Sequence, residues 1–196
     1  MKLLFLHGWG FDSSLWVGVC QFLAPIETRI WDRGYFGRAK AEPVDGPLLV
    51  IGHSLGSLLL AADPPAGCVG LIAINGFDRF SGAVPQRVMD RMQSRFAQSP
   101  REVVDAFRVR CGASPTTEPI DERMLGADFE RLAHLDVRGG TRPMLVLHGG
   151  ADPILPGEMR AGTHQDVPHH TMPNAGHLLP LTHPEWCAAQ IRLLLR

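Results

Sequence analysis

The chain has 196 residues, 45% of them apolar and 20% charged, and its 19 basic and 20 acidic side chains leave a net charge of -1. This length suits one domain with a buried core, and the balanced charge gives no overall attraction to nucleic acid or anionic membranes. The four cysteines are scattered, and no apolar run is long enough for a signal peptide or a membrane span, so a cytoplasmic protein is expected.

Short apolar runs alternate with helical patterns along most of the chain. The expected strands are residues 3–6, 28–31, 48–51, 69–74, 144–147 and 169–172, and the expected helices are 14–23, 54–62 and 184–195. A capping box of Thr182 and Glu185 is expected at the start of the last helix. The alternation predicts an α/β fold, with a mostly parallel sheet that is flanked by helices on both faces.

This alternation stops between residues 77 and 135, where helical patterns replace it. Apolar residues recur every four positions from Val84 to Phe96, and Ser99 with Glu102 forms an expected capping box before a second helix. A helical insertion after one strand of a parallel sheet predicts a cap over the carboxyl edge, where ligands bind. We therefore expect a single domain over residues 1–196, with 77–135 as its small helical cap.

The motif Gly52-His53-Ser54-Leu55-Gly56 lies directly between an expected strand and an expected helix. Gly-x-Ser-x-Gly occurs often by chance, but strand, sharp turn and helix together are the context of a nucleophilic serine. The turn also directs the N–H of Leu55 toward a developing oxyanion. Ser54 is therefore the candidate nucleophile, and an ordinary strand-to-helix turn is the alternative.

A nucleophilic serine needs a histidine base and an acid that orients it. His177 follows the last expected strand in a loop of small residues, and Asp152 follows an expected strand in a glycine turn. The order Ser54, Asp152, His177 places all three on loops at one edge of the sheet. His148, at the end of a strand, is the alternative base, and an unpaired surface carboxylate is the alternative for Asp152.

The loop after the first strand, His7-Gly8-Trp9-Gly10, is the expected source of a second oxyanion donor. Glycines on either side of Trp9 allow close approach, so the Trp9 N–H is expected to face the site. The indole then lines an acyl pocket or packs beneath the cap, and both arrangements are compatible with that role.

The remaining histidines do not predict a metal site. His164, His169 and His170 are close in sequence, but a solvated loop is the simpler interpretation, and the cysteines lack ligand spacing. The expected chemistry needs only side chains and water. The sequence therefore predicts no metal and no cofactor.

These segments resemble the α/β-hydrolase superfamily over nearly the whole chain. Within it, the chain is most similar to the pimeloyl-[acyl-carrier protein] methyl ester esterases of biotin synthesis. The segments that carry this similarity are Leu4 to Gly10 with Trp16, Gly52 to Gly56, and Asn174 to His177 with His183-Pro184-Glu185. Two features depart from the family pattern: the sequence starts at the first parallel strand without the usual amino-terminal hairpin, and the expected cap is short.

The resemblance implies a cofactor-free serine carboxylesterase that converts pimeloyl-[acyl-carrier protein] methyl ester to pimeloyl-[acyl-carrier protein] and methanol. It implies that Trp9 and Leu55 bind the ester carbonyl, and that a phenylalanine-led cap segment from Phe107 to Cys111 lines the acyl chain. A general short-chain carboxylesterase or thioesterase, a lactonase or C–C bond hydrolase, and a non-catalytic receptor on this fold are the alternatives.

The segment from Arg79 to Arg110 carries seven arginines against three acidic residues, a net charge of +4. Three of them, spaced four residues apart on an expected helix, form what we call the arginine row: Arg87, Arg91 and Arg95. The apolar row Val88, Met92 and Phe96 is expected to face the active site, and Asp90 to be the only nearby acid. An acidic acyl carrier protein is the expected partner, and a solvated helix face is the alternative.

Overall fold

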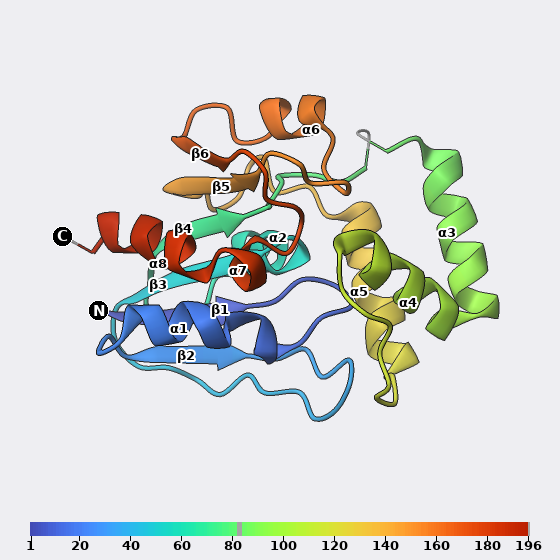
Figure 1. Cartoon of the computed structure of the whole chain (residues 1–196), viewed down its shortest axis with the longest axis horizontal. Coiled ribbons are helices and arrows are strands. Elements are labelled where there is room, and N and C mark those ends of the chain that lie inside the picture. The colour runs from blue at the N-terminus through green and yellow to red at the C-terminus, as the bar shows by residue number, and fades with distance from the viewer. Residues whose placement is uncertain (82–83, 196) are drawn as a thin grey trace.

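The computed structural model of the chain describes residues 1–81 and 84–195. At its centre is a sheet whose described strands all run parallel, in the spatial order β2-β1-β3-β4-β5-β6. The strands are β1 (Lys2–Leu6), β2 (Thr28–Trp31), β3 (Leu48–His53), β4 (Cys68–Ile74), β5 (Leu145–Gly149) and β6 (His169–Met172). Their carboxyl ends therefore meet at one edge of the sheet (Figure 1). This arrangement confirms the expected α/β architecture.

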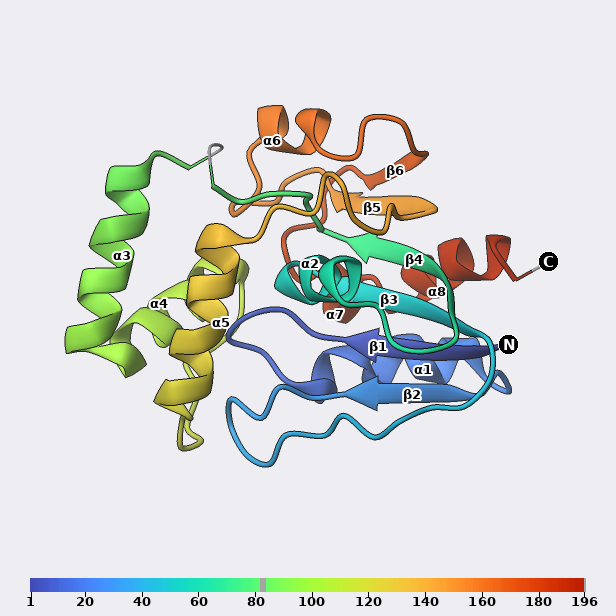
Figure 2. The same cartoon turned by 180° about the vertical axis from the view of Figure 1, so that it is seen from behind.

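Helices cover both faces of the sheet. In Figure 1, α1, α7 and α8 lie on the face toward the viewer, and Figure 2 shows α2 on the opposite face. The helices of the sheet layer are η1 (Ser13–Trp16), α1 (Val17–Leu23), α2 (Leu55–Ala62), α6 (Gly157–Gly162), α7 (Leu179–Thr182) and α8 (Pro184–Leu193). None of the helices in the described ranges is both long and apolar enough to cross a membrane.

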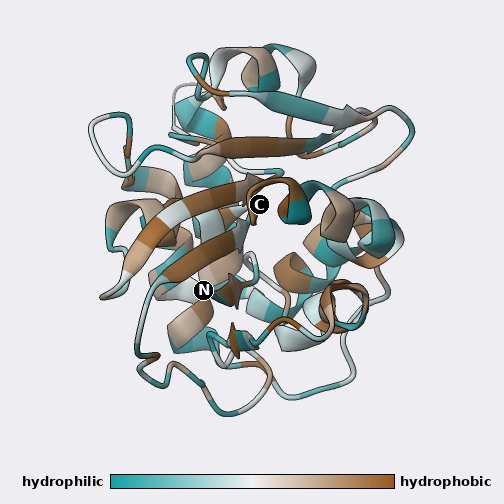
Figure 3. Cartoon of the chain, turned by 90° about the vertical axis from the view of Figure 1, so that its left-hand side faces the viewer, coloured by the Kyte–Doolittle hydropathy of each residue, from teal (hydrophilic) through white to brown (hydrophobic). Residues whose placement is uncertain are grey.

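Each face of the sheet buries its own hydrophobic core. In β1, Leu3 and Phe5 belong to the core beneath α1 and α8, whereas Leu4 and Leu6 belong to the core beneath α2. Successive side chains of a strand point to opposite faces, so a sheet covered on both faces needs continuous apolar strands. Figure 3 shows hydrophobic residues concentrated on the inner strands, whereas β6 at the edge of the sheet is mostly hydrophilic.

Both expected capping boxes are wrong. The Ser99 side chain makes no capping hydrogen bond, and Glu102 instead lies 3.8 Å from Arg95 of the preceding helix. The Thr182 hydroxyl donates to the Leu178 carbonyl, because Thr182 ends one short helix before α8 begins at Pro184. The expected helix at 14–23 is also divided into η1 and α1.

Three longer helices lie beyond the carboxyl edge of the sheet (Figure 1). They are α3 (Gln86–Gln98), α4 (Pro100–Cys111) and α5 (Glu122–His134), and we call residues 86–134 the helical segment. The inward residue of the first turn of α3 is Met89, which is 1% exposed, whereas Val88 is 39% exposed. The expected position of Val88 in an inward apolar row is therefore wrong by one residue, about 100° around the helix.

Candidate active site

Ser54 occupies a strained turn between β3 and α2. Its backbone has φ 51° and ψ -122°, a positive φ that L-residues rarely adopt. Gly56 permits this turn, because a Cβ atom there would collide with the backbone carbonyl oxygens of Leu6 and His7. The motif thus packs the start of α2 directly against the end of β1 and presents Ser54 at the carboxyl edge of the sheet.

Asp152 and His177 form a buried hydrogen-bonded pair. His177 Nδ1 lies 2.8 Å from Asp152 Oδ2, and both side chains are fully buried. Asp152 Oδ1 accepts hydrogen bonds from the amides of Ile154 and Leu155 at 2.7 and 3.2 Å. Burial raises the pKa of Asp152, but the hydrogen bonds from His177 and the two amides outweigh it and lower the pKa.

This pairing determines which ring nitrogen of His177 is basic. An ionised Asp152 can only accept hydrogen bonds, so Nδ1 of His177 carries the proton and Nε2 keeps its lone pair. Nε2 is buried and has no hydrogen-bond partner within residues 1–81 and 84–195. A base that is oriented by a carboxylate and has an unpaired nitrogen is the arrangement that proton transfer requires.

Two residues that sequence reasoning missed hold the His177 loop in place. Asn75, which directly follows β4, donates to the carbonyls of His177 at 2.7 Å and Gly176 at 3.2 Å, and accepts from the Gly149 amide at 2.8 Å. His53 Nε2 donates to the His177 carbonyl at 2.8 Å, and the two rings are 4.9 Å apart. Burial and the nearby His177 lower the pKa of His53 to about 3, so this donor stays neutral.

The loop of residues 8–11 packs against the Ser54 turn. A Cβ atom on Gly8 would lie 3.0 Å from Cβ of Ser54, so glycine permits this close approach. In the part of the chain that the structure describes, the amides of Trp9 and Leu55 donate no hydrogen bond. Within residues 1–81 and 84–195, both expected oxyanion donors are thus unpaired and lie on segments next to Ser54.

The Trp9 indole packs beneath the helical segment. Its ring is 2% exposed, and Nε1 donates to the Leu125 carbonyl at 2.8 Å. The Phe107 ring of α4 lies 5.2 Å from the Trp9 ring and 6.3 Å from the His177 ring. Cys111, one helical turn further, is buried in the core on the α1 and α8 side, and burial raises the pKa of its thiol far above the usual range.

The other histidines have different partners. His148 is 2% exposed, burial lowers its pKa to about 4, and neither ring nitrogen has a partner in the described residues. His169 Nε2 lies 3.0 Å from the His164 carbonyl, and His170 Nδ1 lies 2.6 Å from Gln190 Oε1. Among residues 1–81 and 84–195, no three His, Cys, Asp or Glu side chains are placed to hold a metal ion.

Comparison with known proteins identifies the family of the chain. The model of the Alpha/beta hydrolase family matches residues 29–190. The chain belongs to this family. It is 23% identical over 234 residues to a pimeloyl-[acyl-carrier protein] methyl ester esterase of Pectobacterium atrosepticum, covering 96% of this chain and 92% of the relative.

Solved esterase structures share the fold of this alpha/beta hydrolase. A thermophilic esterase from Thermogutta terrifontis is 20% identical and has a TM-score of 0.76, with 100% of this chain and 89% of that chain covered. An esterase from Exiguobacterium antarcticum is 15% identical and has a TM-score of 0.77, with 100% and 91% covered. Both similarities extend over the entire chain and include the helical segment.

The arginine row lies on the exposed side of α3. It borders a surface groove of about 310 Å³, which is lined by Arg87, Val88, Arg91, Met92 and Arg95. The expectation that Asp90 is the only nearby acid is wrong, because α4 follows α3 directly and brings Glu102 within 3.8 Å of Arg95. Asp90 itself accepts a hydrogen bond from Gln86. The Arg95–Glu102 pair is exposed and therefore weak.

Proposed function

We propose that the protein is a serine carboxylesterase in which Ser54 is the nucleophile, His177 the general base and Asp152 the residue that orients it. The observation that carries this proposal is Nε2 of His177, which has no hydrogen-bond partner among the residues that the structure describes. It is the basic end of a buried hydrogen-bonded pair, and the His177 ring contacts that of His53, the residue before Ser54.

The proposed reaction has two similar halves. The Ser54 hydroxyl oxygen attacks the ester carbonyl carbon while Nε2 of His177 takes its proton, and Asp152 stabilises the imidazolium. The carbonyl oxygen becomes negative and accepts hydrogen bonds from the amides of Leu55 and Trp9. Collapse of this intermediate expels the alcohol, which receives the proton from His177. Water then attacks the acyl-enzyme by the same route and releases the acid.

The proposed substrate is pimeloyl-[acyl-carrier protein] methyl ester, with methanol as the released alcohol. The similarity to the Pectobacterium relative over nearly the full length of both chains supports this assignment. In this proposal Phe107 and Cys111 of α4 line the acyl chain, because Phe107 reaches the His177 ring and Cys111 lies one turn further along the helix.

The arginine row is the proposed docking site for the carrier protein. Its guanidinium groups are exposed, and the Val88 and Met92 side chains offer apolar surface between them. Guanidinium forks bind carboxylates and phosphates in two-point geometry, and acyl carrier proteins present both. The row thus supplies the charge that an acidic partner needs.

Hydrolysis of a p-nitrophenyl ester and of the carrier-bound methyl ester tests the proposal. We expect Ser54→Ala, His177→Ala and Asp152→Asn each to lose about 10⁴-fold or more in kcat while circular dichroism shows them folded. The Ser54 and His177 changes combined should cost little more than either alone, because the residues act as a unit.

Each contrary result has a definite meaning. If His177→Ala is active and His148→Ala is inactive, the general base is His148 and not His177. Hydrolysis of small esters without hydrolysis of the carrier-bound ester would favour a general short-chain carboxylesterase. Binding of esters with no turnover of either substrate would favour a receptor. Growth of a biotin-requiring strain that lacks its methyl ester esterase would support the assigned substrate.

A further inference from the structure

The Gly8–Trp9 peptide bond is held by the His7 side chain. The N–H of this peptide is the proposed oxyanion donor, and its carbonyl oxygen lies 2.9 Å from His7 Nδ1. A carbonyl can only accept, so Nδ1 carries a proton and donates to it. Because a peptide unit is planar, fixing its carbonyl also fixes the direction of its N–H.

His7 is in turn held by residues that follow β2. The backbone N–H of Arg33 donates to His7 Nε2 at 3.0 Å, and the Asp32 carboxylate lies 3.3 Å from the same nitrogen. The Tyr35 ring packs edge-on against the imidazole, with centroids 5.5 Å apart. His7 is 1% exposed, so these contacts leave it little freedom.

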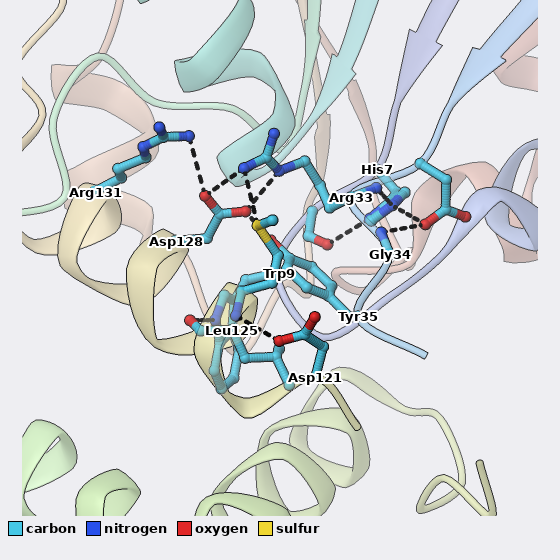
Figure 4. A network of polar contacts seen from close by, with 12 residues as sticks. His7, Trp9, Arg33, Gly34, Tyr35, Asp121, Leu125, Asp128 and Arg131 are labelled. Carbon is cyan, nitrogen blue, oxygen red and sulfur yellow. Dashed lines mark hydrogen bonds and ion pairs between the residues drawn. The ribbon is translucent and has the colours of Figure 1, made fainter. Parts of the chain in front are cut away.

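Two of these neighbours of His7, Arg33 and Tyr35, donate hydrogen bonds to one carboxylate of α5, that of Asp128 (Figure 4). Asp128 is 0% exposed and accepts from Arg33 Nε at 2.6 Å, Arg33 Nη2 at 2.8 Å and the Tyr35 hydroxyl at 2.7 Å. Arg131 adds a longer contact at 3.3 Å. Charge-assisted, two-point bonds of this kind fix orientation more strictly than apolar packing does.

Helix α5 also holds the side chain of Trp9. The Leu125 carbonyl, one turn before Asp128, accepts the hydrogen bond of the Trp9 indole. In Figure 4 the Trp9 indole reaches α5 beside Arg33 and Tyr35, at the helical turn that carries Leu125 and Asp128. The Trp9 residue is therefore fixed through its side chain by Leu125 and through its preceding peptide by His7.

We propose that Asp128 is a positioning residue of the oxyanion hole. By joining α5 to Arg33 and Tyr35, it keeps the Trp9 N–H directed at the place where the carbonyl oxygen becomes negative. Within the described residues the Asp128 side chain bonds to Arg33, Tyr35 and Arg131, so in this proposal it acts on the Trp9 N–H through Arg33, Tyr35 and His7. This inference rests on the proposed function, and it predicts an effect on transition-state binding rather than on substrate binding.

The test compares catalysis with the binding of an alkyl boronic acid, which forms a tetrahedral adduct with a catalytic serine. In Asp128→Asn we expect kcat for a p-nitrophenyl ester and boronic acid affinity to fall together by about 10- to 100-fold, with KM nearly constant. Tyr35→Phe should show the same pattern more weakly. His7→Asn keeps a donor near Nδ1 and should retain more kcat than His7→Leu.

Asp121→Ala is the matched control. Asp121 caps the start of α5 by accepting from the Met124 amide at 2.8 Å, so its loss lowers the melting temperature through the same helix. It leaves the contacts of Asp128 intact, and kcat and boronic acid affinity should not change. If Asp128→Asn does not fold, the inference is tested by comparing kcat and boronic acid affinity of Tyr35→Phe with those of Asp121→Ala.

Three results would overturn the inference. The first is wild-type boronic acid affinity in folded Asp128→Asn or, failing that, in Tyr35→Phe. The second is a rise in KM without loss of kcat, and the third is an equal loss in Asp121→Ala. In each case an active wild-type protein leaves the proposed function standing. A wild-type protein that hydrolyses no ester would overturn both proposals together.

Discussion

Asn75 connects loops that leave three different strands. It follows β4, and its amide side chain bonds to Gly149 at the end of β5 and to residues 176 and 177 beyond β6. Its own φ is 44°, in the left-handed region that asparagine tolerates better than most residues. One buried side chain thus sets the spacing between the Asp152 loop and the His177 loop.

Replacing Asn75 by alanine should destabilise the protein strongly. The change removes three hydrogen bonds from a fully buried position and places alanine at an unfavourable φ. We expect the free energy of unfolding to fall by about 3 kcal/mol in urea denaturation. Asn174→Ala, at an exposed position in the same region, should stay within about 0.5 kcal/mol of the wild type. Equal stability of the two variants would contradict this view.

His148 should make the stability of the protein sensitive to acid. Its folded pKa of about 4 lies below the unfolded value of 6.5, so the unfolded chain binds more protons between these pH values. Stability is therefore lost as pH falls through this range, by about 3 kcal/mol for the full shift. His53, with its pKa of about 3, acts in the same direction.

His148→Leu should flatten this pH dependence in urea denaturation between pH 7 and 4. At pH 7 its stability should equal or exceed that of the wild type, because neither ring nitrogen has a partner in the described part of the chain. Esterase activity should persist. His134→Leu, on the exposed side of α5, is the control and should leave the dependence as steep as before.

The candidate site residues are predictable from sequence, but the residues that hold them are not. Ser54 has a local motif, and Asp152 and His177 follow from the order of loops along the chain. The structure indeed places the latter two 2.8 Å apart. The hydrogen bonds of Asn75 join residues that are 74 to 102 positions apart in the sequence. Those that Asp128 accepts from Arg33 and Tyr35 join residues 93 to 95 positions apart, and no local sequence pattern marks such contacts.

At the scale of elements, the proposed docking site and the proposed catalytic residues lie on different parts of the fold. The arginine row lies on the exposed face of α3, whereas the proposed catalytic residues and oxyanion donors lie at the ends of β1, β3, β5 and β6. Charge reversal of the row to glutamate should raise KM for a carrier-bound ester by about 10-fold at low ionic strength and reduce its salt dependence. Hydrolysis of a small free ester should barely change.

A triple reversal elsewhere is the matched control for this measurement. Arg29, Arg142 and Arg192 are exposed and belong to β2, the segment before β5, and α8. Their change to glutamate alters the net charge by the same amount and should leave KM for the carrier-bound ester near its original value. A similar rise in both triple variants would show that total charge, not the row, attracts the partner.

Strands were easier to predict than helix faces. The strands β2 and β6 occupy the expected residues, although their sequences TRIW and HHTM are not apolar runs and both lie at the edges of the sheet. The inner strands β3 and β5 are buried throughout, as apolar runs of this length between turns predict for a parallel sheet. On α3, the adjacent apolar residues Val88 and Met89 leave the inward face ambiguous until packing selects Met89. The capping boxes at Ser99 and Thr182 are wrong because other contacts occupy their residues. Glu102 lies near Arg95 of α3, and the Thr182 hydroxyl donates to the Leu178 carbonyl.

At the scale of the whole molecule, the pairing of β4 with β5 joins the two halves of the sheet, and we call this pairing the seam. The Ile72–Leu145 pairing joins residues about 73 positions apart, with the helical segment between them, whereas the other neighbouring strands are about 21 to 46 apart. Closing this longer loop costs about 1 kcal/mol more in chain entropy than closing the shortest. Ser54 belongs to one side of the seam, and Asp152 and His177 belong to the other.

The seam has a consequence for the order of events during folding. Each half of the sheet can form from nearer contacts, but Ser54 and His177 belong to different halves, which are joined when β4 pairs with β5. Since distant pairings form slowly, we expect esterase activity to return later than helical circular dichroism when the protein is diluted out of urea. If activity and circular dichroism recover at the same time, β4 pairs with β5 as early as the other strands pair. We therefore expect the candidate active site to be the last part of the molecule to be assembled.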